Sequence, residues 1–354
     1  MGLRDPSPGE VLVRIVCAGV CHSDVGQADG EWSHRLPVVL GHEGSAVVEA
    51  VGPGVTGVEP GQRAVLDMAP GCGACRHCVS GRPILCQDAL DAMGEGRLIG
   101  APTPYSLRGE PVATYALLGC YSELAVVSER SIVVLPEGVP ADVAALVGCA
   151  VVTGVGAAFE TIDVAAGSRG AVIGAGGVGV NAIQGARVRG AAEIMAIDPA
   201  PARREQSQRF GATHQLDPSD EDDLAALRRV APREGFDWSI VTVGSSDAIR
   251  LGVDITRPSG VTCVVGLTRE GIQTEIDMLE VVTYEKTIRG SAYGTVPARL
   301  LMPRILDLYL QGALLLDELV SHRYPLERVN EAFELSREAA GLRVVLSISG
   351  DGRF

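Results

Sequence analysis

A glycine-rich turn between an apolar strand and a helix constrains the fold of this 354-residue chain more than any other feature. The run Gly174-Ala-Gly176-Gly177-Val-Gly179 follows the apolar residues 171–173 and precedes a helical stretch. A G-x-G-x-x-G run in this context is typical of a dinucleotide site, with the pyrophosphate at the helix N-terminus. Gly174 makes the turn, Gly176 lets the backbone approach the ligand, and Gly179 lets the helix pack on the strand. A turn that serves close packing alone is the alternative.

An acidic residue lies where the second strand of this region ends. Asp198 follows the apolar run 194–197 and lies 24 residues after Gly174. A carboxylate at this place accepts hydrogen bonds from the adenosine ribose and repels a 2′-phosphate. The position therefore favours NAD over NADP, while the nearby charges of Arg203 and Arg204 work against that preference.

The sequence pattern changes near residue 150. The first 150 residues are rich in Gly and Pro with short apolar runs between them, which predicts an all-β, barrel-like domain. Strands are expected there at residues 10–16, 46–51, 62–66 and 122–127. Residues 87–120 carry few periodic signals, so the sequence predicts a long loop.

Beyond residue 150, strands alternate with helical stretches, which predicts a doubly wound parallel sheet. The expected strands are residues 171–174, 194–197, 239–243 and 261–265, with a helix over 180–189. From about residue 286 the chain is expected to return to the first domain, with a helix over residues 300–311.

Composition argues against several functions. The chain has 30 Lys and Arg against 44 Asp and Glu, a net charge of −14, and only 4% aromatic residues, so nucleic-acid binding is disfavoured. The uncharged run 143–159 falls short of the ~20 residues of a spanning helix, and the N-terminus lacks the apolar core of a signal peptide. We therefore expect no membrane partner and a cytoplasmic location. There the nine cysteines would bind metal rather than form disulfides.

Four closely spaced cysteines predict a structural metal site. Cys72, Cys75, Cys78 and Cys86 have the spacing C-x2-C-x2-C-x7-C. Four thiolates in a short loop suit tetrahedral zinc with no open position. The rival is an iron–sulfur cluster, but that motif has a last gap of about three residues followed by Pro. Here the last gap is seven residues and Gln87 follows, which favours zinc.

Three separated fragments carry candidate ligands for a second metal. They are Cys21-His22-Ser23-Asp24, Gly41-His42-Glu43-Gly44 and Gly148-Cys149-Ala150. Two thiolates and one imidazole leave a fourth zinc position open, which is typical of a catalytic site. Zinc lowers the pKa of a bound alcohol and polarises a bound carbonyl, and a nicotinamide carries the hydride.

With these motifs in this order, the chain resembles the zinc-dependent alcohol dehydrogenases of the medium-chain dehydrogenase/reductase superfamily over nearly its whole length. The resemblance implies an α/β plus β architecture. A GroES-like β-barrel catalytic domain would comprise residues 1–151 and 290–354. A Rossmann dinucleotide-binding domain, with a doubly wound parallel sheet, would comprise residues 152–289.

The resemblance also implies roles for individual residues. Cys21, His42 and Cys149 would bind the catalytic zinc, Glu43 could exchange onto the metal, and Asp24 would orient His42. Two zinc ions per chain are expected, one catalytic and one structural.

Substrate and cofactor residues follow from the same resemblance. Ser23 would bond the substrate hydroxyl. The expected cofactor-binding residues are His22, Gly174, Gly176, Gly177, Val178, Gly179, Asp198, Arg203, Val243, Val265 and Arg343. The expected substrate pocket consists of Trp32, Met68, Tyr115 and Ala116. Because these four are apolar or aromatic, a hydrophobic or aromatic alcohol or aldehyde fits best, with ordinary core packing as the alternative.

The chain departs from this family at three places. It begins late, so we expect either a misassigned start or an incomplete barrel. Many relatives place a proton-relay His or Tyr three residues after the serine, where this chain has Gly26. The loop with Arg108-Gly109-Glu110-Pro111 resembles that of the longer-loop branch, which includes glutathione-dependent formaldehyde dehydrogenase. That branch holds the glutathione carboxylate with an Arg, where this chain has Leu90.

Three hypotheses for function follow. The leading one is a zinc-dependent alcohol or aldehyde oxidoreductase that uses NAD. The second is another enzyme on the same scaffold, either a thiol-adduct formaldehyde dehydrogenase or a biosynthetic imine or alkene reductase. The third is a zinc-stabilised binding protein without activity. The resemblance implies a homodimer joined through edge strands around residues 270–292, with a tetramer as the alternative. Cys17, Cys120 and Cys263 match no ligand position and are expected to be small buried hydrophobes.

Overall fold

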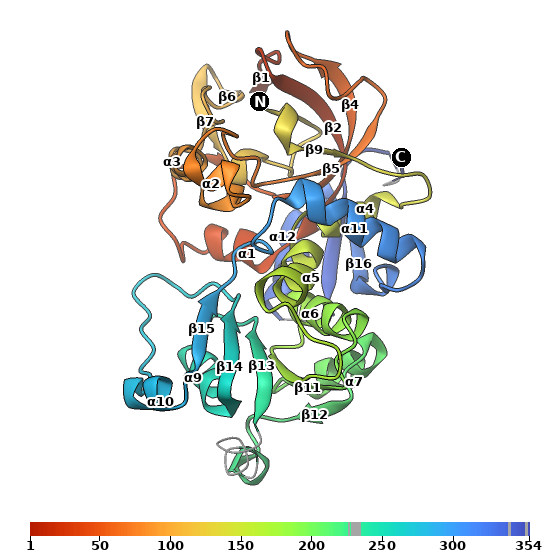
Figure 1. Ribbon diagram of the computed structural model, residues 1–354. Coiled ribbons are helices and arrows are strands. Elements are labelled where there is room, and N and C mark those ends of the chain that lie inside the picture. The colour runs from red at the N-terminus through yellow and green to blue at the C-terminus, as the bar shows by residue number, and fades with distance from the viewer. Residues whose placement is uncertain (226, 228–234, 339–340, 351–352) are drawn as a thin grey trace. The chain divides into compact units, whose positions relative to one another are not determined.

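The computed structural model describes residues 1–225, 227, 235–338, 341–350 and 353–354. The chain forms two compact units (Figure 1). Unit 1 comprises Met1–Val152 and Val296–Phe354, and unit 2 comprises Thr153–Thr295.

Six parallel strands form the sheet of unit 2, in the spatial order β12-β11-β10-β13-β14-β15. Numbered along the chain, this is the order 3-2-1-4-5-6 of dinucleotide-binding folds, so the expected doubly wound sheet is confirmed. The strands are β10 (Arg169–Ile173), β11 (Glu193–Ile197), β12 (His214–Leu216), β13 (Phe236–Val241), β14 (Thr256–Val264) and β15 (Thr287–Gly290).

Helices of unit 2 follow these strands, as a parallel sheet requires. They are α6 (Gly177–Val188), α7 (Pro201–Phe210), α9 (Ser246–Ile255) and α10 (Met278–Thr283). Residues of the central strands are almost continuously buried, since helices cover both faces of such a sheet. Gly170 is required in β10 because an added Cβ would lie 2.1 Å from the indole of Trp238.

Two sheets and several helices build unit 1. One sheet has the order β16-β17-β2-β4-β5-β9, and β8 also pairs with β2; the other has the order β1-β6-β7-β3. The first sheet contains β2 (Glu10–Val20), β4 (Glu43–Val51), β5 (Arg63–Leu66), β8 (Leu124–Ser128), β9 (Ile132–Val134), β16 (Val320–Pro325) and β17 (Arg343–Ser347). The second contains β1 (Gly2–Leu3), β3 (Val38–Val39), β6 (Tyr105–Leu107) and β7 (Glu110–Thr114).

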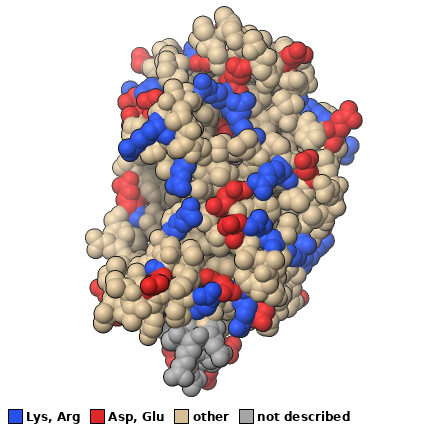
Figure 2. Space-filling model, viewed as in Figure 1, with Lys and Arg blue, Asp and Glu red and all other residues tan. Residues whose placement is uncertain are grey.

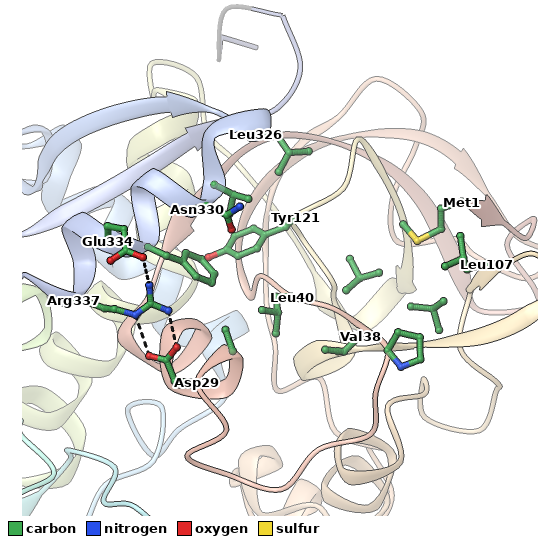
Figure 3. Close-up of a pocket in the computed structure, with 16 residues that line it drawn as sticks. Met1, Asp29, Val38, Leu40, Leu107, Tyr121, Leu326, Asn330, Glu334 and Arg337 are labelled. Carbon is green, nitrogen blue, oxygen red and sulfur yellow. Dashed lines mark hydrogen bonds and ion pairs between the residues drawn. The ribbon is translucent and has the colours of Figure 1, made fainter.

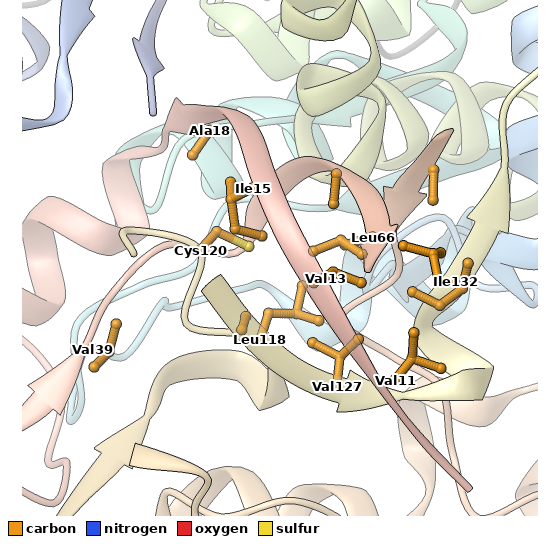
Figure 4. Packing of buried hydrophobic residues seen from close by; sticks show 14 of the residues in the cluster. Val11, Val13, Ile15, Ala18, Val39, Leu66, Leu118, Cys120, Val127 and Ile132 are labelled. Atoms are coloured by element: carbon orange, nitrogen blue, oxygen red, sulfur yellow. The ribbon is translucent and has the colours of Figure 1, made fainter. Parts of the chain in front are cut away.

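The core of unit 1 is organised around the long strand β2 (Figure 4). Val11, Val13 and Ile15 alternate along this strand and are fully buried, as the period of two in the sequence requires. They pack in one cluster with Leu66 of β5 and Ile132 of β9. This packing fixes the end of β2 at Val20 and the start of β4 at Glu43. The expected ligands Cys21 and His42 are the residues next to these two points.

Residues 87–120 do not form the long loop that the sequence suggested. They contain α3 (Gln87–Glu95), β6, β7 and the 3₁₀ turn η2 (Tyr115–Leu117). These elements are too short to give a clear period in the sequence. Helix α3 buries Ala89 and Ala92 and ends at Gly96, which has a φ of +66°, the left-handed conformation that commonly terminates helices.

The other helices of unit 1 lie between its strands and near its C-terminus. They are α1 (His22–Ala28), α2 (Arg76–Val79), α4 (Ala141–Leu146), α11 (Ala298–Leu310) and α12 (Val329–Arg337), with short turns η1 (Pro83–Leu85), η3 (Glu129–Ser131), η6 (Asp317–Leu319) and η7 (Leu326–Arg328).

One helical run, Ala141–Thr161, is long and apolar enough to cross a membrane by those two criteria alone. It consists of α4, the π-helical segment η4 (Val147–Val151), α5 (Val152–Gly156) and the π-helical segment η5 (Ala157–Thr161). Its most apolar window is 89% buried by other parts of the protein. A helix that is buried on nearly all sides is apolar all round, so the composition of this run is that of a core helix.

Charged side chains of both signs are interspersed on the face shown in Figure 2. Clusters of Lys and Arg lie beside clusters of Asp and Glu there. This face therefore does not carry the continuous basic stripe that a nucleic-acid surface needs.

Candidate functional site

Four potential metal ligands from three segments of unit 1 lie together. One ligand atom from each of Cys21, His42, Glu43 and Cys149 lies within 4.8 Å of the others. Cys21 immediately precedes α1, His42 and Glu43 mark the start of β4, and Cys149 lies in η4. Single π-helical turns of this kind often occur at functional sites. The structure thus brings together the ligands expected from three separated fragments.

A buried carboxylate connects the first two of these segments. Asp24 is fully buried and accepts hydrogen bonds from the backbone N–H of Cys21 (3.2 Å) and of Gly41 (3.0 Å). Its Oδ1 also lies 3.1 Å from Nδ1 of His42, and its Oδ2 accepts a bond from the hydroxyl of Tyr121 at 3.0 Å. Four donors match the four acceptor positions of a carboxylate, which is what a buried charge requires.

This arrangement orients His42 for metal binding. With Nδ1 directed at Asp24, the other ring nitrogen, Nε2, is left as the ligand atom, as in carboxylate–histidine–zinc sites. The Ser23 hydroxyl lies 3.3 Å from this Nε2, so it lies beside the expected metal position. Burial lowers the pKa of His42, but the charge of Asp24 outweighs burial and the pKa is raised well above its usual range.

The two thiols of the cluster are electrostatically unequal. A hydrogen bond from Cys149 lowers the pKa of Cys21 well below its usual range, against the effect of burial. The same contact and burial raise the pKa of Cys149. One thiolate is therefore favoured even without a cation, and a bound cation would favour the second, since thiolates are the metal-binding form.

Glu43 supplies the clearest sign that the cluster fits a cation. Its side chain is fully buried, and among the described residues neither carboxylate oxygen has a hydrogen-bond partner. Burial raises its pKa to about 7, although the Arg343 guanidinium, with Nη1 3.8 Å from Oε1, opposes this shift. An unsatisfied buried carboxylate costs free energy, which a cation bound between Cys21, His42 and Cys149 would reduce.

The four cysteines of the loop also converge. The sulfur atoms of Cys72, Cys75, Cys78 and Cys86 lie within 4.8 Å of one another. The backbone N–H of Cys72 points at Sγ of Cys86 (3.3 Å), and the N–H of Cys75 points at Sγ of Cys72 (3.4 Å). Such N–H···S contacts stabilise thiolates, so this set suits a closed tetrahedral zinc site.

In unit 2 the glycine turn has the geometry that its sequence predicts. Gly174 has a φ of +91°, and an added Cβ on Gly179 would lie 1.8 Å from the carbonyl oxygen of Gly174. An added Cβ on Gly176 would meet only Arg203, at 3.9 Å, so open space lies beside the backbone there. Helix α6 begins after Gly176 without a side-chain cap. The first N–H groups of this helix, which have no partner within the helix, and the open backbone fit an anionic pyrophosphate.

Asp198 follows β11 and is tied to this turn. Its Oδ2 accepts the N–H of Ala175 (2.8 Å), its Oδ1 accepts the N–H of Ala200 (2.9 Å), and Nη1 of Arg203 lies 3.8 Å away. The carboxylate is 2% exposed. Val243 and Val265 follow the ends of β13 and β14 at the same carboxyl edge of the sheet, where ligands of doubly wound folds bind.

Of the expected substrate-pocket residues, Tyr115 contacts the expected metal ligand His42. Its ring stands edge-on to His42, with centroids 5.5 Å apart, and its hydroxyl is 3.5 Å from the Ser23 carbonyl oxygen. The indole of Trp32 lies against Gly26, where an added Cβ would be 2.6 Å from the ring. Ala116 is buried in a left-handed conformation, and Met68 packs against the core around β2.

A separate cavity of about 780 Å³ opens on unit 1 (Figure 3). Leu40, Tyr121 and Phe333 line it, and the ion-paired side chains Asp29 and Arg337 lie at one end. None of the four expected substrate-pocket residues lines this cavity.

His22 and Arg343 lie in unit 1 with different surroundings. His22 is exposed at the start of α1, whereas Arg343 is 8% exposed and lies beside Glu43. Their expected contact with a cofactor pyrophosphate stays a prediction.

Sequence reasoning missed two residues near the metal ligands. Tyr121, which donates to Asp24, lies 97 residues from it in the chain, and no motif surrounds it. His34 stacks edge-on against Tyr115 with centroids 5.6 Å apart, and its buried Nε2 has no hydrogen-bond partner among the described residues. A single His or Tyr in a loop gives no sequence signal of such contacts.

Comparisons with known proteins agree with this geometry. The family described as "Alcohol dehydrogenase GroES-like domain" matches residues 7–137, and the family described as "Zinc-binding dehydrogenase" matches residues 177–310. The NDMA-dependent alcohol dehydrogenase of Amycolatopsis methanolica is 36% identical over 356 residues, which cover 99% of this chain and 94% of that protein.

Two further similar proteins extend the comparison. The S-(hydroxymethyl)glutathione dehydrogenase of Haemophilus influenzae is 35% identical over 344 residues, covering 96% of this chain and 91% of that protein. The crystal structure of benzyl alcohol dehydrogenase from Acinetobacter calcoaceticus superposes with a TM-score of 0.90 at 30% identity, covering 98% of this chain and 94% of that one.

Proposed function

Because this chain belongs to the zinc-dependent alcohol dehydrogenases of the medium-chain dehydrogenase/reductase superfamily, we propose that it transfers a hydride between NAD(H) and a hydrophobic or aromatic alcohol or aldehyde. The observation that carries this proposal is the converged cluster of Cys21, His42, Glu43 and Cys149. Two thiols and one imidazole leave a fourth zinc position open, as in a catalytic rather than a structural zinc site, and the Glu43 carboxylate lies beside them.

The metal sites have separate tasks in this proposal. Cys21, His42 and Cys149 hold the catalytic zinc, with Glu43 able to exchange onto it, and the four loop cysteines hold a structural zinc. Zinc, when bound, stabilises negative charge on the substrate oxygen. Asp24 keeps Nδ1 of His42 occupied, so Nε2 faces the metal position.

Ser23 is the proposed group for moving the substrate proton. Its hydroxyl lies 3.3 Å from Nε2 of His42, next to the position that the substrate oxygen would take. A hydroxyl there can accept the substrate proton while passing its own to the cofactor ribose and to water. Gly26 offers no side chain for the usual next step of a relay.

NAD is the proposed cofactor. The open backbone beside Gly176 and the uncapped start of α6 suit the pyrophosphate. Asp198 supplies a carboxylate for the ribose hydroxyls and disfavours a 2′-phosphate. Arg203, 3.8 Å from Asp198, is partly neutralised by it, which supports NAD over NADP.

A hydrophobic or aromatic substrate is proposed because Tyr115 and Trp32 lie near Ser23 and α1. A similar solved structure, that of a benzyl alcohol dehydrogenase, supports an aromatic alcohol. His34 adds a single unpaired nitrogen next to Tyr115, which could bond a polar substituent of the substrate.

A thiol adduct of formaldehyde is the second candidate substrate. The similarity to an S-(hydroxymethyl)glutathione dehydrogenase favours it. Leu90 argues against glutathione itself, because this 44%-exposed side chain stands where an Arg is expected to bind the glutathione carboxylate. Another low-molecular-weight thiol fits this candidate better.

We also propose a homodimer formed through unit 2. β15 is the terminal strand of its sheet, and the neighbouring helix α10 exposes Met278 (62%), Leu279 (75%) and Val282 (71%). An open strand edge beside an apolar helix is typical of an interface between subunits. Light scattering after size-exclusion chromatography should show a dimer for the wild-type protein and a monomer for the Leu279→Glu variant. A tetramer would support the other assembly, and a monomeric wild type would exclude both.

The cytoplasm is the proposed location because both sets of cysteine ligands must stay reduced to bind zinc. Fractionation of cells that produce the protein would test this proposal.

The decisive experiment measures NADH production by zinc-replete protein with short aliphatic, long aliphatic, benzylic and terpenoid alcohols. Each assay is run without additions and with an added thiol plus formaldehyde. A third set contains NDMA, because one relative is named an NDMA-dependent alcohol dehydrogenase. Turnover of a bulky apolar alcohol without thiol supports the leading proposal. Activity only with thiol supports the second candidate. No turnover despite NADH binding and two zinc ions per chain would point to imine or alkene reduction, and failure to bind NADH would overturn the enzymatic proposal.

A further inference from the structure

We propose that the Tyr121 hydroxyl is a positioning group for the catalytic metal. By donating to Asp24 it fixes the carboxylate that orients His42. This inference rests on the proposed function, because it requires His42 to be a zinc ligand. It adds a third residue, from a distant loop, to the chain of hydrogen bonds that ends at the metal.

The contacts of Asp24 define what Tyr121 contributes. The carboxylate oxygen Oδ1 is bonded by Gly41 N–H and His42, whereas Oδ2 is bonded by Cys21 N–H at 3.2 Å and Tyr121 at 3.0 Å. The Tyr121 hydroxyl therefore makes the shorter of the two bonds to Oδ2. The other three donors come from residues 21–42, so only this fourth donor among those described ties the carboxylate to another part of unit 1.

The backbone holds Tyr121 in place independently of its hydroxyl. Its N–H donates to the carbonyl of Leu40 at 2.9 Å. Gly41 has a φ of +93°, and an added Cβ would lie 2.5 Å from the Tyr121 ring, so the ring packs directly against the segment that carries His42. The Phe333 ring of α12 lies 6.1 Å away, and the remaining side of Tyr121 lines the cavity in Figure 3.

A second acceptor competes for the same proton. The Tyr121 hydroxyl also lies 3.1 Å from the carbonyl oxygen of Gly19, and a hydroxyl has one hydrogen. A bond to a carboxylate is about twice as strong as one to a neutral carbonyl. Asp24 is therefore the favoured acceptor. If Gly19 were the true acceptor, Tyr121 would serve only to hold the end of β2.

Removal of the Tyr121 hydroxyl should weaken metal binding without leaving a cavity in the core. In Tyr121→Phe the ring and its packing remain, but Oδ2 of a fully buried carboxylate keeps one donor, the Cys21 N–H. Partners that orient a metal-bound His affect metal affinity or activity by about 10- to 100-fold. Because Tyr121 acts one bond further away, we expect loss of the catalytic metal to a chelator to become about 3- to 10-fold faster.

The experiment compares Tyr121→Phe with Tyr105→Phe as a matched control. The Tyr105 hydroxyl is also buried and donates to the Gly119 carbonyl at 3.0 Å, but it does not bond Asp24. Both variants and wild type are loaded with zinc or cobalt, and metal release to a chelator is followed. The kinetic phase that is absent from His42→Ala identifies the catalytic metal. The cobalt absorption bands report the ligand geometry directly.

A double-mutant cycle separates the two acceptors. If Tyr121 acts through Asp24, Tyr121→Phe should change release little in an Asp24→Asn background, since coupled residues are non-additive. Faster release and shifted cobalt bands in Tyr121→Phe but not in Tyr105→Phe would support the inference. Equal behaviour of the two variants, or an undiminished effect in the Asp24→Asn background, would overturn it. Absence of any second metal in wild type would instead refute the proposed function.

Discussion

Oδ1 of Asp24 lies 3.1 Å from Nδ1 of His42, and both side chains are buried. The two residues are 18 positions apart and come from α1 and the start of β4. Their contact therefore depends on the packing of unit 1 and, at the same time, fixes which nitrogen of His42 faces Cys21 and Cys149, the proposed metal ligands.

Asp24→Asn should weaken catalytic zinc about 10- to 100-fold. The Asn amide has one acceptor oxygen, whereas the Asp24 carboxylate has two. Its NH2 group would therefore face two of the four groups that now donate to Asp24, and those two groups would lose their acceptor. Competition with a chelator measures the affinity. The structural zinc, held by the four loop cysteines, serves as the internal control and should not change. Unaltered affinity for both ions would contradict the role of Asp24.

Asp198→Asn should reduce the preference for NAD over NADP. The amide oxygen can still accept one of the two N–H bonds, from Ala175 of the glycine turn or from Ala200 after β11. Loss of the negative charge removes the repulsion of a 2′-phosphate and weakens the bonds to the ribose. A bond to a charged group is worth about 1.5–3 kcal/mol, so the ratio of kcat/KM for NAD to that for NADP should fall at least about tenfold.

Kinetics with both cofactors check this prediction, and Asp217→Asn is the control. Asp217 pairs with Arg204 at 2.9 Å but lies outside the expected ribose site. An unchanged ratio in Asp198→Asn would show that Asp198 does not select the cofactor.

The sequence predicts those parts of this protein that depend on local pattern. The strand–glycine–helix motif at Gly174 and the spacing of the four loop cysteines each predict a candidate site without tertiary information. The expected parallel sheet follows from the alternation of strands and helices. Helix α3 was not predicted from the sequence; it has nine residues and buries only the small side chains of Ala89 and Ala92.

Contacts across long sequence separations could not be predicted. Tyr121 reaches Asp24 over 97 residues, and its role depends on the conformation of Gly41 and on the ring of Phe333. The pairing of Glu43 with Arg343 likewise joins β4 to β17. A side chain acquires such a role only when packing brings two elements together, and one sequence does not reveal which elements meet.

Cys78→Ser should remove one zinc ion per chain and destabilise unit 1. A hydroxyl is a poor zinc ligand, and the remaining three thiols would lose the tetrahedral set. If the site contributes about 2–4 kcal/mol, the midpoint of thermal unfolding should fall by about 5–15 °C. Metal analysis and calorimetry measure both effects. Cys263→Ser changes a buried thiol outside both clusters and should keep two zinc ions.

Stability should decrease in acid partly through Glu10. Arg4 donates two hydrogen bonds to its carboxylate, at 2.5 and 2.8 Å. Burial raises the pKa of Glu10, but the Arg4 bonds and the Ser7 N–H outweigh burial and lower it below the usual 4.5. A lowered pKa stabilises the folded state above the unfolded value of the pKa, and this stabilisation disappears as pH falls through the folded value.

Glu10→Gln tests this assignment. The variant should lose about 1 kcal/mol of the free energy of unfolding at pH 7, and the difference from wild type should shrink below about pH 4. Denaturant titrations between pH 3 and pH 7 give both curves. A difference that stays constant across this range would exclude a titrating Arg4–Glu10 pair.

Gly26→Ala should change substrate choice by displacing Trp32. An added Cβ at Gly26 would lie 2.6 Å from the indole ring, which must then move. Gly94→Ala is the matched control, because Gly94 also lies inside a helix but an added Cβ there meets nothing within 4 Å. The ratio of kcat/KM for benzyl alcohol to that for a short aliphatic alcohol should change at least about threefold in Gly26→Ala, since forcing an extra carbon into a packed contact costs about 1–3 kcal/mol. It should not change in Gly94→Ala. Equal ratios in both variants would place Trp32 outside the substrate pocket.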